Sequence, residues 1–356
     1  MTESAISDQE KLEQEKKAVQ EKRRKDLERL GIKLKNFYQN YFKVDTIFEV
    51  IERKNFETRE FGFDRLDQGF TRNKSFESPN DLKEYLGTFP IGGAYIGSLY
   101  QDRLLPGNNK VKAITIHNSR WLGRELIYDF DMDEYDPVRK CDCQGKMVCN
   151  DCWYLMQEAS VIITDTLKED FGFRDLRWVY TGGRGYHCWV LDKQAFTLDQ
   201  DQRSAIIGYM QLIHDPKGLQ KIDSVGEHAE LLKRRIYSRL GKYFVLQEYN
   251  NNLLKELKIK KKDIDFAREF LPTTNIETEI ISFFNSIIPK ESEDNFMLEV
   301  IKNLYPRIDH KVTIDIRRLI RMPGSIHGRN HNLCEFVDDP FNFNPIKDAK
   351  KLDQFV

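Results

Sequence analysis

The stretch Glu125-Leu-Ile-Tyr-Asp-Phe-Asp-Met-Asp133 decides how this chain folds. Successive side chains of a β-strand point to opposite faces, so the alternation predicts a strand with one apolar face. The other face carries Ile127, Asp129, Asp131 and Asp133. Carboxylates at neighbouring positions of one face repel one another unless cations lie between them. Because Mg²⁺ prefers carboxylate and phosphate oxygens, the stretch predicts a divalent-metal site. The alternative is an edge strand with an acidic face.

Composition places the chain among ordinary globular proteins. Its 356 residues are 40% hydrophobic and 12% aromatic, and 56 basic side chains nearly balance 57 acidic ones, giving a net charge of −1. No stretch approaches the roughly 18 apolar residues of a membrane span, and the N-terminus lacks the apolar core of a signal peptide. We therefore expect an intracellular protein without a membrane partner. Any contact with nucleic acid should be local, because the chain has no large excess of positive charge.

Four of the six cysteines lie within twelve residues of one another. They are Cys141, Cys143, Cys149 and Cys152. Four soft sulfur ligands on two tight turns can complete a tetrahedral site, which predicts structural Zn²⁺ with no open position for catalysis. The first pair is Cys-x-Cys rather than the commoner Cys-x-x-Cys. The alternative is four unpaired buried thiols, which such a charged segment could hardly bury. Cys188 and Cys334 are expected to be small core residues.

A β-hairpin is predicted at residues 176–191. Two apolar runs flank the turn Thr181-Gly-Gly-Arg-Gly185, as in strands joined by a glycine-rich connection. Glycines let backbone N–H groups approach an anion closely, and Arg184 and His187 supply donors that suit phosphate. The hairpin is therefore either a phosphate-binding element or simply a turn.

The remaining segments give coarser predictions. Residues 9–29 are densely charged, which indicates a solvated helix or a partly ordered arm. An aromatic-rich helix is expected at 34–48, and short strands at 60–63 and 93–96. Residues 197–300 show helical spacing that indicates an inserted subdomain.

A further helix is expected over 312–320, ending before Pro323. Asp309 precedes it, and Ser325 and His327 follow it. Since an aspartate ahead of a helix is usually a turn or capping residue, Asp309 by itself proves little.

Three of these pieces, in this order, resemble the small catalytic subunit of archaeal and eukaryotic DNA primases. They are Asp129-Phe-Asp131 with the cysteine cluster, the hairpin ending in His187, and Arg307-Ile-Asp309 eighteen residues before His327. The resemblance runs from about Phe37 to Val337. Each motif is modest alone, and the ordered set is specific.

The resemblance implies site residues. Metal ligands, for Mg²⁺ or Mn²⁺, would be Asp129, Asp131 and Asp309; Asp133 matches no family ligand. Residues implied to bind the nucleotide are Thr181, Arg184, His187, Arg321, Ser325, His327 and, more remotely, Arg72. Two departures stand out. Many eukaryotic members carry a second arginine where this chain has Gly183, and many archaeal members have Gly-Lys-Thr-Gly where it has Gly328-Arg-Asn-His.

The implied fold is an α/β catalytic core with a central mixed sheet, an inserted zinc knuckle and a helical subdomain. We expect a charged N-terminal extension (1–33), a core formed by 34–196 and 301–345 with the knuckle at 141–152, the helical subdomain (197–300) and a tail (346–356). The implied cofactors are two catalytic Mg²⁺ or Mn²⁺ ions and one structural Zn²⁺.

The implied function is template-directed nucleotidyl transfer that makes short primers on single-stranded DNA from nucleoside triphosphates. Implied partners are a large primase subunit, as a heterodimer within the primosome, and the replication machinery. The compartment would be the cytoplasm in an archaeon and the nucleus in a eukaryote. Alternatives are a single-chain repair primase-polymerase of the same superfamily, a sugar transferase that uses Asp-x-Asp, and a non-enzymatic zinc nucleic-acid-binding module.

Overall fold

The computed structural model describes residues 8–107, 112–139, 141–211, 227–239, 277–290 and 300–356, with isolated positions between 260 and 269. These residues form two compact units. Unit 1 contains the chain up to Leu122 together with Leu319–Glu335 and Lys350–Val356, and unit 2 contains Gly123–Arg318 and Phe336–Ala349. None of the helices in the described ranges is long and apolar enough to cross a membrane.

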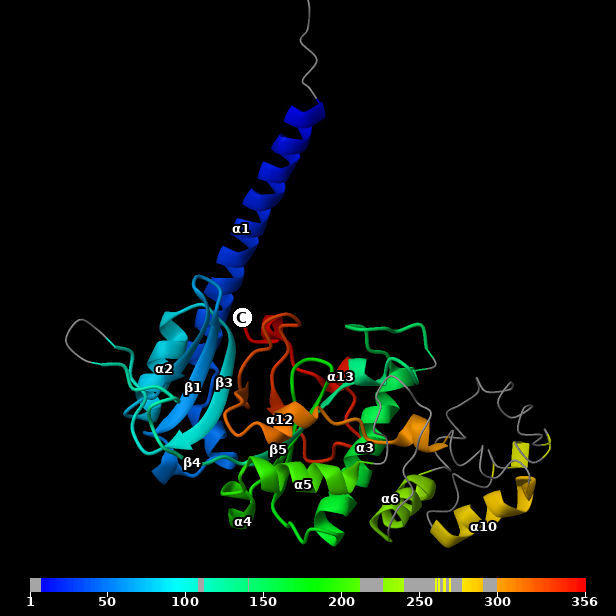
Figure 1. The fold of residues 1–356 in the computed structure, drawn as a ribbon. Coiled ribbons are helices and arrows are strands. Elements are labelled where there is room, and N and C mark those ends of the chain that lie inside the picture. Colours follow the sequence, from blue (N-terminus) through cyan, green and yellow to red (C-terminus); the bar gives the residue numbers. More distant parts are fainter. Residues whose placement is uncertain are drawn as a thin grey trace, which may run out of the picture. The chain divides into compact units, whose positions relative to one another are not determined.

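Unit 1 begins with the long helix α1 (Asp8–Asn40), drawn in dark blue in Figure 1. Residues 12–29 are exposed, while Leu34 and Phe37 near the end of the helix are buried. The reason lies in the sequence, since apolar side chains at helical spacing begin only in the last turns. The predicted solvated helix is thus confirmed, and it is continuous with the first core helix. That core helix ends at Asn40, and a 3₁₀ helix, η1 (Val44–Glu49), follows it.

The sheet of unit 1 contains both strands predicted between residues 60 and 96. Its strands are β1 (Arg59–Arg65), β2 (Gly69–Lys74), β3 (Ile91–Tyr100), β4 (Trp121–Gly123) and β8 (Ile320–Arg321). The order is β2-β1-β3-β4, and β8 also pairs with β3. The helical elements of this unit are α2 (Pro79–Thr88), η2 (Arg53–Asn55) and η6 (Leu352–Gln354). The N-terminus of α2 is closed by a capping box between Ser78 and Asp81, as the sequence Ser-Pro-Asn-Asp favours.

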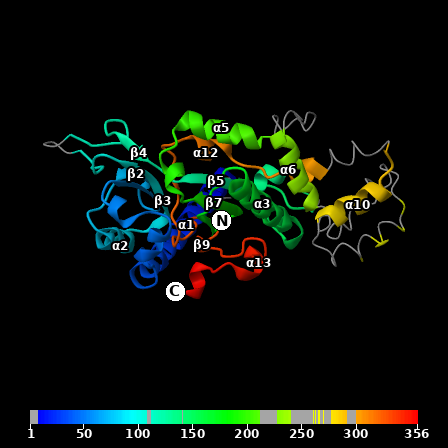
Figure 2. The ribbon, with the colours of Figure 1, turned by 90° about the horizontal axis from the view of Figure 1, so that it is seen from below.

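The sheet of unit 2 is built around the acidic strand and the predicted hairpin. Its strands are β5 (Leu126–Asp131), β6 (Leu176–Tyr180), β7 (Gly185–Val190) and β9 (Glu335–Phe336), in the order β5-β7-β6-β9. Tyr128, Phe130 and Tyr186 belong to one buried cluster with residues of α3 (Asn150–Glu169). In Figure 2, α3 runs alongside β5 and β7. The rings of Trp153 and Tyr186 lie 5.1 Å apart, edge to face. Alternation along β5 therefore places Asp129 and Asp131 on the face opposite α3.

The other helical elements of unit 2 are short. They are η3 (Met132–Tyr135), α4 (Lys193–Phe196), α5 (Gln200–Met210), α6 (Glu227–Ser238), α10 (Glu277–Ile287), α12 (His310–Ile314) and α13 (Pro345–Asp348). Three of them, α5, α6 and α10, fall in the predicted helical subdomain, much of which lies outside the described residues. The predicted domain boundaries stay predictions.

Three expectations need correction. The α/β prediction holds, but in the part of the chain that the structure describes there are two sheets instead of one central mixed sheet, and the pairs β1–β2, β1–β3, β3–β8, β5–β7 and β6–β7 are all antiparallel. Short turns explain the antiparallel pairing of β1 with β2 and of β6 with β7, since a parallel pair needs a longer crossover. The acidic strand ends at Asp131, so Asp133 lies in η3. The helix expected over 312–320 ends at Ile314, because Ile320 instead pairs with Ile96 of β3; here sheet pairing overrides an ambiguous apolar pattern.

Candidate functional site

The side chains of Asp129 and Asp131 lie on the face of the sheet that points away from α3. The strand paired with β5 in the sheet is β7, the second strand of the hairpin. Asp129 is in register with His187, and Asp131 with Gly185. His187 Nε2 is 3.5 Å from Asp129 Oδ1. A Cβ on Gly185 would stand 1.7 Å from the carbonyl oxygen of Phe130, so only glycine permits the close approach of the two strands.

Asp309 joins these acids from a segment 180 residues further along the chain. Its backbone N–H donates to the Asp129 carbonyl at 2.9 Å. Two residues earlier, the N–H of Arg307 donates to the Tyr135 hydroxyl at 2.9 Å. The Asp309 carboxylate also caps α12, accepting from the N–H of Lys311 at 2.9 Å. Backbone hydrogen bonds thus fix the position of Asp309. Asp309 is also a helix cap, as its position ahead of a helix in the sequence suggests.

A buried arginine holds the far end of α12. Arg124 Nη1 donates to the carbonyls of Val312 (3.0 Å) and Asp315 (2.8 Å), which belong to the last turn of the helix and its C-cap. A cation is favourable at a helix C-terminus because its last carbonyls are otherwise unsatisfied. This contact locks α12, and with it Asp309, to the chain entering β5.

The acids act on one another electrostatically. Burial, followed by the charges of Asp131 and Asp309, raises the pKa of Asp129 from 3.8 to about 7. Burial also raises the pKa of Asp131, although Arg184 opposes the rise. Like charges held this close favour protonation or a bound cation. Whatever neutralises them stabilises this face of the sheet.

The hairpin turn supplies the counter-charge. Arg184 Nη2 lies 2.6 Å from Asp131 Oδ2 and 3.0 Å from Asp133 Oδ2. The turn is held by the Thr181 hydroxyl, which accepts from the N–H of Gly183 at 3.2 Å, and by the Arg184 carbonyl, which accepts from the N–H of Met132. Sequence reasoning set Asp133 aside, although its place in the Asp-x-Asp-x-Asp alternation was a signal that it belongs with the other two.

The remaining predicted nucleotide residues belong to unit 1. Arg72 makes two hydrogen bonds to the buried carboxylate of Glu60, at 2.9 and 3.1 Å. Arg321 lies with its guanidinium carbon 5.0 Å from the ring centroid of Tyr95. The hydroxyl of Ser325 is buried and donates to the Met322 carbonyl at 2.6 Å.

The ring of His327, in unit 1, has a defined tautomer. His327 Nδ1 accepts from the backbone N–H groups of Arg329 (3.3 Å) and Asn330 (3.2 Å). An accepting Nδ1 leaves the proton on Nε2 in the neutral ring. The loop Gly328-Arg-Asn-His, which departs from the archaeal pattern, therefore still orients His327 as a donor through Nε2.

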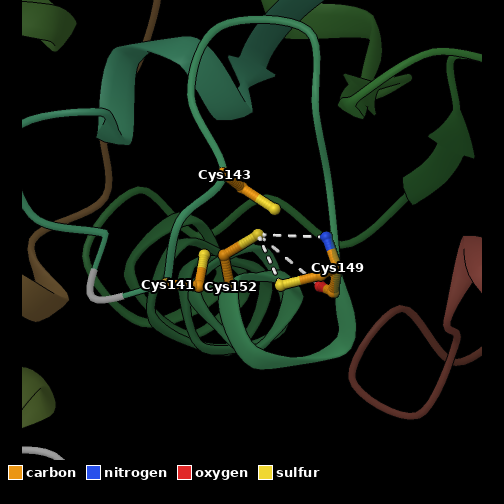
Figure 3. A group of neighbouring side chains, drawn as sticks. All are labelled: Cys141, Cys143, Cys149 and Cys152. Atoms are coloured by element: carbon orange, nitrogen blue, oxygen red, sulfur yellow. Dashed lines mark hydrogen bonds between the residues drawn. The ribbon is translucent and has the colours of Figure 1, made fainter.

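The four clustered cysteines of unit 2 come together as predicted. Figure 3 shows their sulfur atoms gathered at the N-terminal end of α3, all within 4.8 Å of one another. Cys149 is the N-cap of α3, and its N–H donates to Cys152 Sγ at 3.3 Å. Burial raises the pKa of Cys143 to about 11 and that of Cys152 to about 12. Among the described residues no other group of three or more acids, histidines or cysteines is so compact. The cluster suits one tetrahedral ion.

An ion pair between buried Arg139 and partly exposed Asp136 anchors the knuckle to the segment after the acidic strand. The guanidinium of Arg139 pairs with Asp136, which follows η3, and donates to the carbonyl of Met147 at 2.6 Å. Asp136 in turn accepts from the N–H of Gly145 at 2.9 Å. This ion pair was not identified from the sequence. An aspartate and an arginine three residues apart, just before the first cysteine, could have suggested it.

Comparison with known sequences decides the family. A sequence model described as DNA primase small subunit matches residues 129–339, more than half of the chain. The chain belongs to the DNA primase small subunit family. The match to this primase family begins at Asp129 and includes the cysteine cluster, the hairpin, Asp309 and His327.

Curated primase relatives come from both archaea and eukaryotes. The DNA primase small subunit of Saccharomyces cerevisiae is 28% identical over 353 residues, covering 89% of this chain and 83% of the relative. The subunit PriS of Archaeoglobus fulgidus is 30% identical, covering 89% and 83%. That of Pyrococcus horikoshii is 29% identical, covering 88% and 90%. The similarity therefore extends over most of the chain, beyond the range of the primase family model.

Proposed function

We propose that this chain is the catalytic subunit of a DNA primase, which makes short primers for replication on a single-stranded template. Its family consists of primer-synthesising nucleotidyltransferases. The observation that carries the proposal is the backbone bond from Asp309 to Asp129, which brings a third carboxylate to the open face of β5. Arg184 in the hairpin turn and His187 on the neighbouring strand β7 add the donors that a triphosphate needs.

The donor set fits two divalent cations. Asp129, Asp131 and Asp309 offer hard oxygens, as Mg²⁺ and Mn²⁺ prefer. Burial and, after it, repulsion by Asp131 and Asp309 raise the pKa of Asp129, and bound cations offset both effects. Two such ions, when bound, activate a primer 3′-hydroxyl and stabilise charge on the phosphates. The protein's part is to hold three carboxylates at fixed positions by backbone bonds.

Arg184 and His187 are proposed to bind the phosphates of the incoming nucleotide. Both lie on or beside the turn, which Thr181 closes through its bond to Gly183. In this structure Nη2 of Arg184 lies against both Asp131 and Asp133. The guanidinium has further N–H donors that can reach a phosphate.

For unit 1, the family resemblance implies that Arg321, Ser325, His327 and Arg72 contact the nucleotide, and we propose this role for them. The oriented Nε2 of His327 is the best supported donor, because its tautomer is set by two backbone bonds. Ser325 acts through the turn, since its hydroxyl is used by the Met322 carbonyl. Arg72 is committed to Glu60 through two bonds, so any contact with the triphosphate has to use its remaining donors.

The cysteine cluster is proposed to bind one structural Zn²⁺. With raised pKa values, Cys143 and Cys152 carry protons at neutral pH in the metal-free protein. Zinc binding therefore releases protons and couples to folding. Four sulfur ligands leave no open position, so the cluster is assigned to scaffolding of the segment between β5 and α3.

A larger subunit is the proposed partner, since the relatives are named small subunits. Charge gives an independent reason. Holding a template depends largely on neutralising phosphates, and the chain has a net charge of −1. Initiation joins two free nucleotides without a duplex, so the partner's contacts should matter most there.

The test is primer synthesis by purified protein on single-stranded DNA with Mg²⁺ or Mn²⁺ and labelled ribo- and deoxynucleotides. Template-dependent products that disappear in Asp309→Asn are expected. No turnover with either metal, with or without the larger subunit, would favour the zinc-binding module. Equal initiation with and without the partner at one salt concentration would favour a single-chain primase-polymerase.

A further inference from the structure

Asp133 lies at the site without an assigned role. One nitrogen of Arg184, Nη2, is shared between Asp131 at 2.6 Å and Asp133 at 3.0 Å. The arginine side chain is 21% exposed, whereas Asp133 is 42% exposed. Asp133 thus stands at the rim of the acidic face and points its carboxylate at the arginine.

Asp131 and Asp133 differ in whether they can keep their contact with Arg184 once metal and nucleotide are bound. Under the proposed function, Asp131 turns its oxygens to a cation and can no longer hold Arg184 fully. The guanidinium carries five donors in a rigid fork, so one nitrogen can stay on Asp133 while the others reach phosphate oxygens. Asp133 is therefore the carboxylate that can keep its contact throughout.

The backbone around Asp133 is fixed independently of its side chain. Its carbonyl accepts from the N–H of Asp136 at 3.1 Å, closing η3. Its N–H lies 3.5 Å from Asp131 Oδ1. Substitution of the carboxylate should therefore leave the turn in place, which makes the position suitable for a test.

We propose that Asp133 is a positioning residue that holds Arg184 in place for the nucleotide phosphates after Asp131 engages a cation. The proposal rests on the proposed function. An arginine held by a carboxylate has less side-chain freedom to lose on binding than an unrestrained one. Asp133 therefore affects nucleotide affinity and leaves the chemical step unchanged.

The experiment is a double-mutant cycle in steady-state primer extension at saturating Mg²⁺. Asp133→Asn is expected to raise the nucleotide KM about fivefold with kcat within about twofold, the order expected for one partly exposed ion pair. Asp133→Glu should recover most of the affinity. In an Arg184→Ala background, Asp133→Asn should add nothing, because residues acting through one contact are not additive.

Glu134→Gln is the matched control. It removes the same charge from the next residue of η3, which is exposed, and should change KM by less than about twofold. A thermal melt of each variant checks folding, and Asp133→Ser takes the place of the asparagine variant in the cycle if that variant is unstable.

Three outcomes overturn the inference. Additive effects in the cycle would mean that Asp133 acts independently of Arg184. A lower kcat with a higher Mg²⁺ requirement would make Asp133 a metal ligand. If the KM rises in Arg184→Ala but is unchanged in Asp133→Asn, Asp133 has no positioning role, while the phosphate-binding role of Arg184 stands. If Arg184→Ala itself leaves KM unchanged, the phosphate-binding role in the proposed function fails as well.

Discussion

Unit 2 holds two clusters of candidate metal ligands, and they are assembled in opposite ways. The four cysteines come from one segment of twelve residues, and two of them, Cys143 and Cys152, are buried. The acids come from one strand and from Asp309, 180 residues later, and Asp131 is 37% exposed. The first cluster can gather its ligands within one local segment, whereas the second exists only when the fold is complete. A closed local site suits scaffolding, and an open composite one suits turnover.

The largest expected effect is on the acids. Asp129→Asn, Asp131→Asn and Asp309→Asn should each reduce nucleotide incorporation about a thousandfold or more, roughly 4 kcal/mol of barrier. Without divalent metal their Tm values should equal or exceed that of the wild type, because a charge is removed from a repelling group. Extension assays and calorimetry in chelator measure the two quantities. If the Tm instead falls by many degrees, the acids stabilise the fold, and they do not differ from the cysteines in this respect.

The cysteines should respond in the opposite direction. Metal analysis is expected to find about one Zn²⁺ per chain, and Cys149→Ser should lower both the zinc content and the Tm, since zinc binding contributes to folding. Cys334→Ser, outside the cluster, is the control for loss of a thiol. A fully folded chain without zinc would contradict the assignment.

Arg184 should show an intermediate effect confined to the nucleotide. Arg184→Ala removes a charged donor that the proposal places on phosphate, so the nucleotide KM should rise about tenfold. Template affinity, measured by fluorescence anisotropy at one salt concentration, should change little. The reverse result, weaker template binding with the same KM, would make the hairpin a DNA contact.

The smallest effect concerns pH. The pKa of Asp129 is raised from 3.8 to about 7, so between these values the folded, metal-free protein binds more protons than the unfolded chain. This group's contribution to stability is therefore present at low pH and falls as pH rises from about 4 to about 7. Metal competes with the same proton, and the Mg²⁺ concentration for half-maximal extension should decrease severalfold from about pH 6 to pH 8. A requirement independent of pH would show that Asp129 carries no proton to displace.

Local patterns were predictable from the sequence. Alternation at Asp129 and Asp131 and the glycine-rich turn before His187 yielded β5 and the β6–β7 hairpin, and cysteine spacing yielded the cluster. The alternation of side chains along a strand and the short spacing of the cysteines follow from local chain geometry, so they can be interpreted without knowing the tertiary structure.

Interactions between distant segments were not predictable in this way. The apolar run ending at Ile320 suits a helix and a strand equally, and only its pairing with Ile96 decides the outcome. The ion pair between Arg184 and Asp133 forms where the strand has already ended, because Asp133 lies in the turn of η3 and not in β5. The approach of Asp309 to Asp129 was inferred from family resemblance, and its basis is a backbone bond that no local pattern encodes.

The three glycines of the hairpin turn are not equally open to evolutionary change. Gly182 has a φ of 74°, a conformation that disfavours other residues, and Gly185 leaves no space for a Cβ beside Phe130. Gly183 is not among the residues with positive φ, so its backbone does not require glycine. The backbone at the middle position is therefore compatible with a side chain, whereas Gly182 and Gly185 call for glycine. An arginine at position 183 would place a second cation next to Arg184 in the turn, and the backbone would not oppose it.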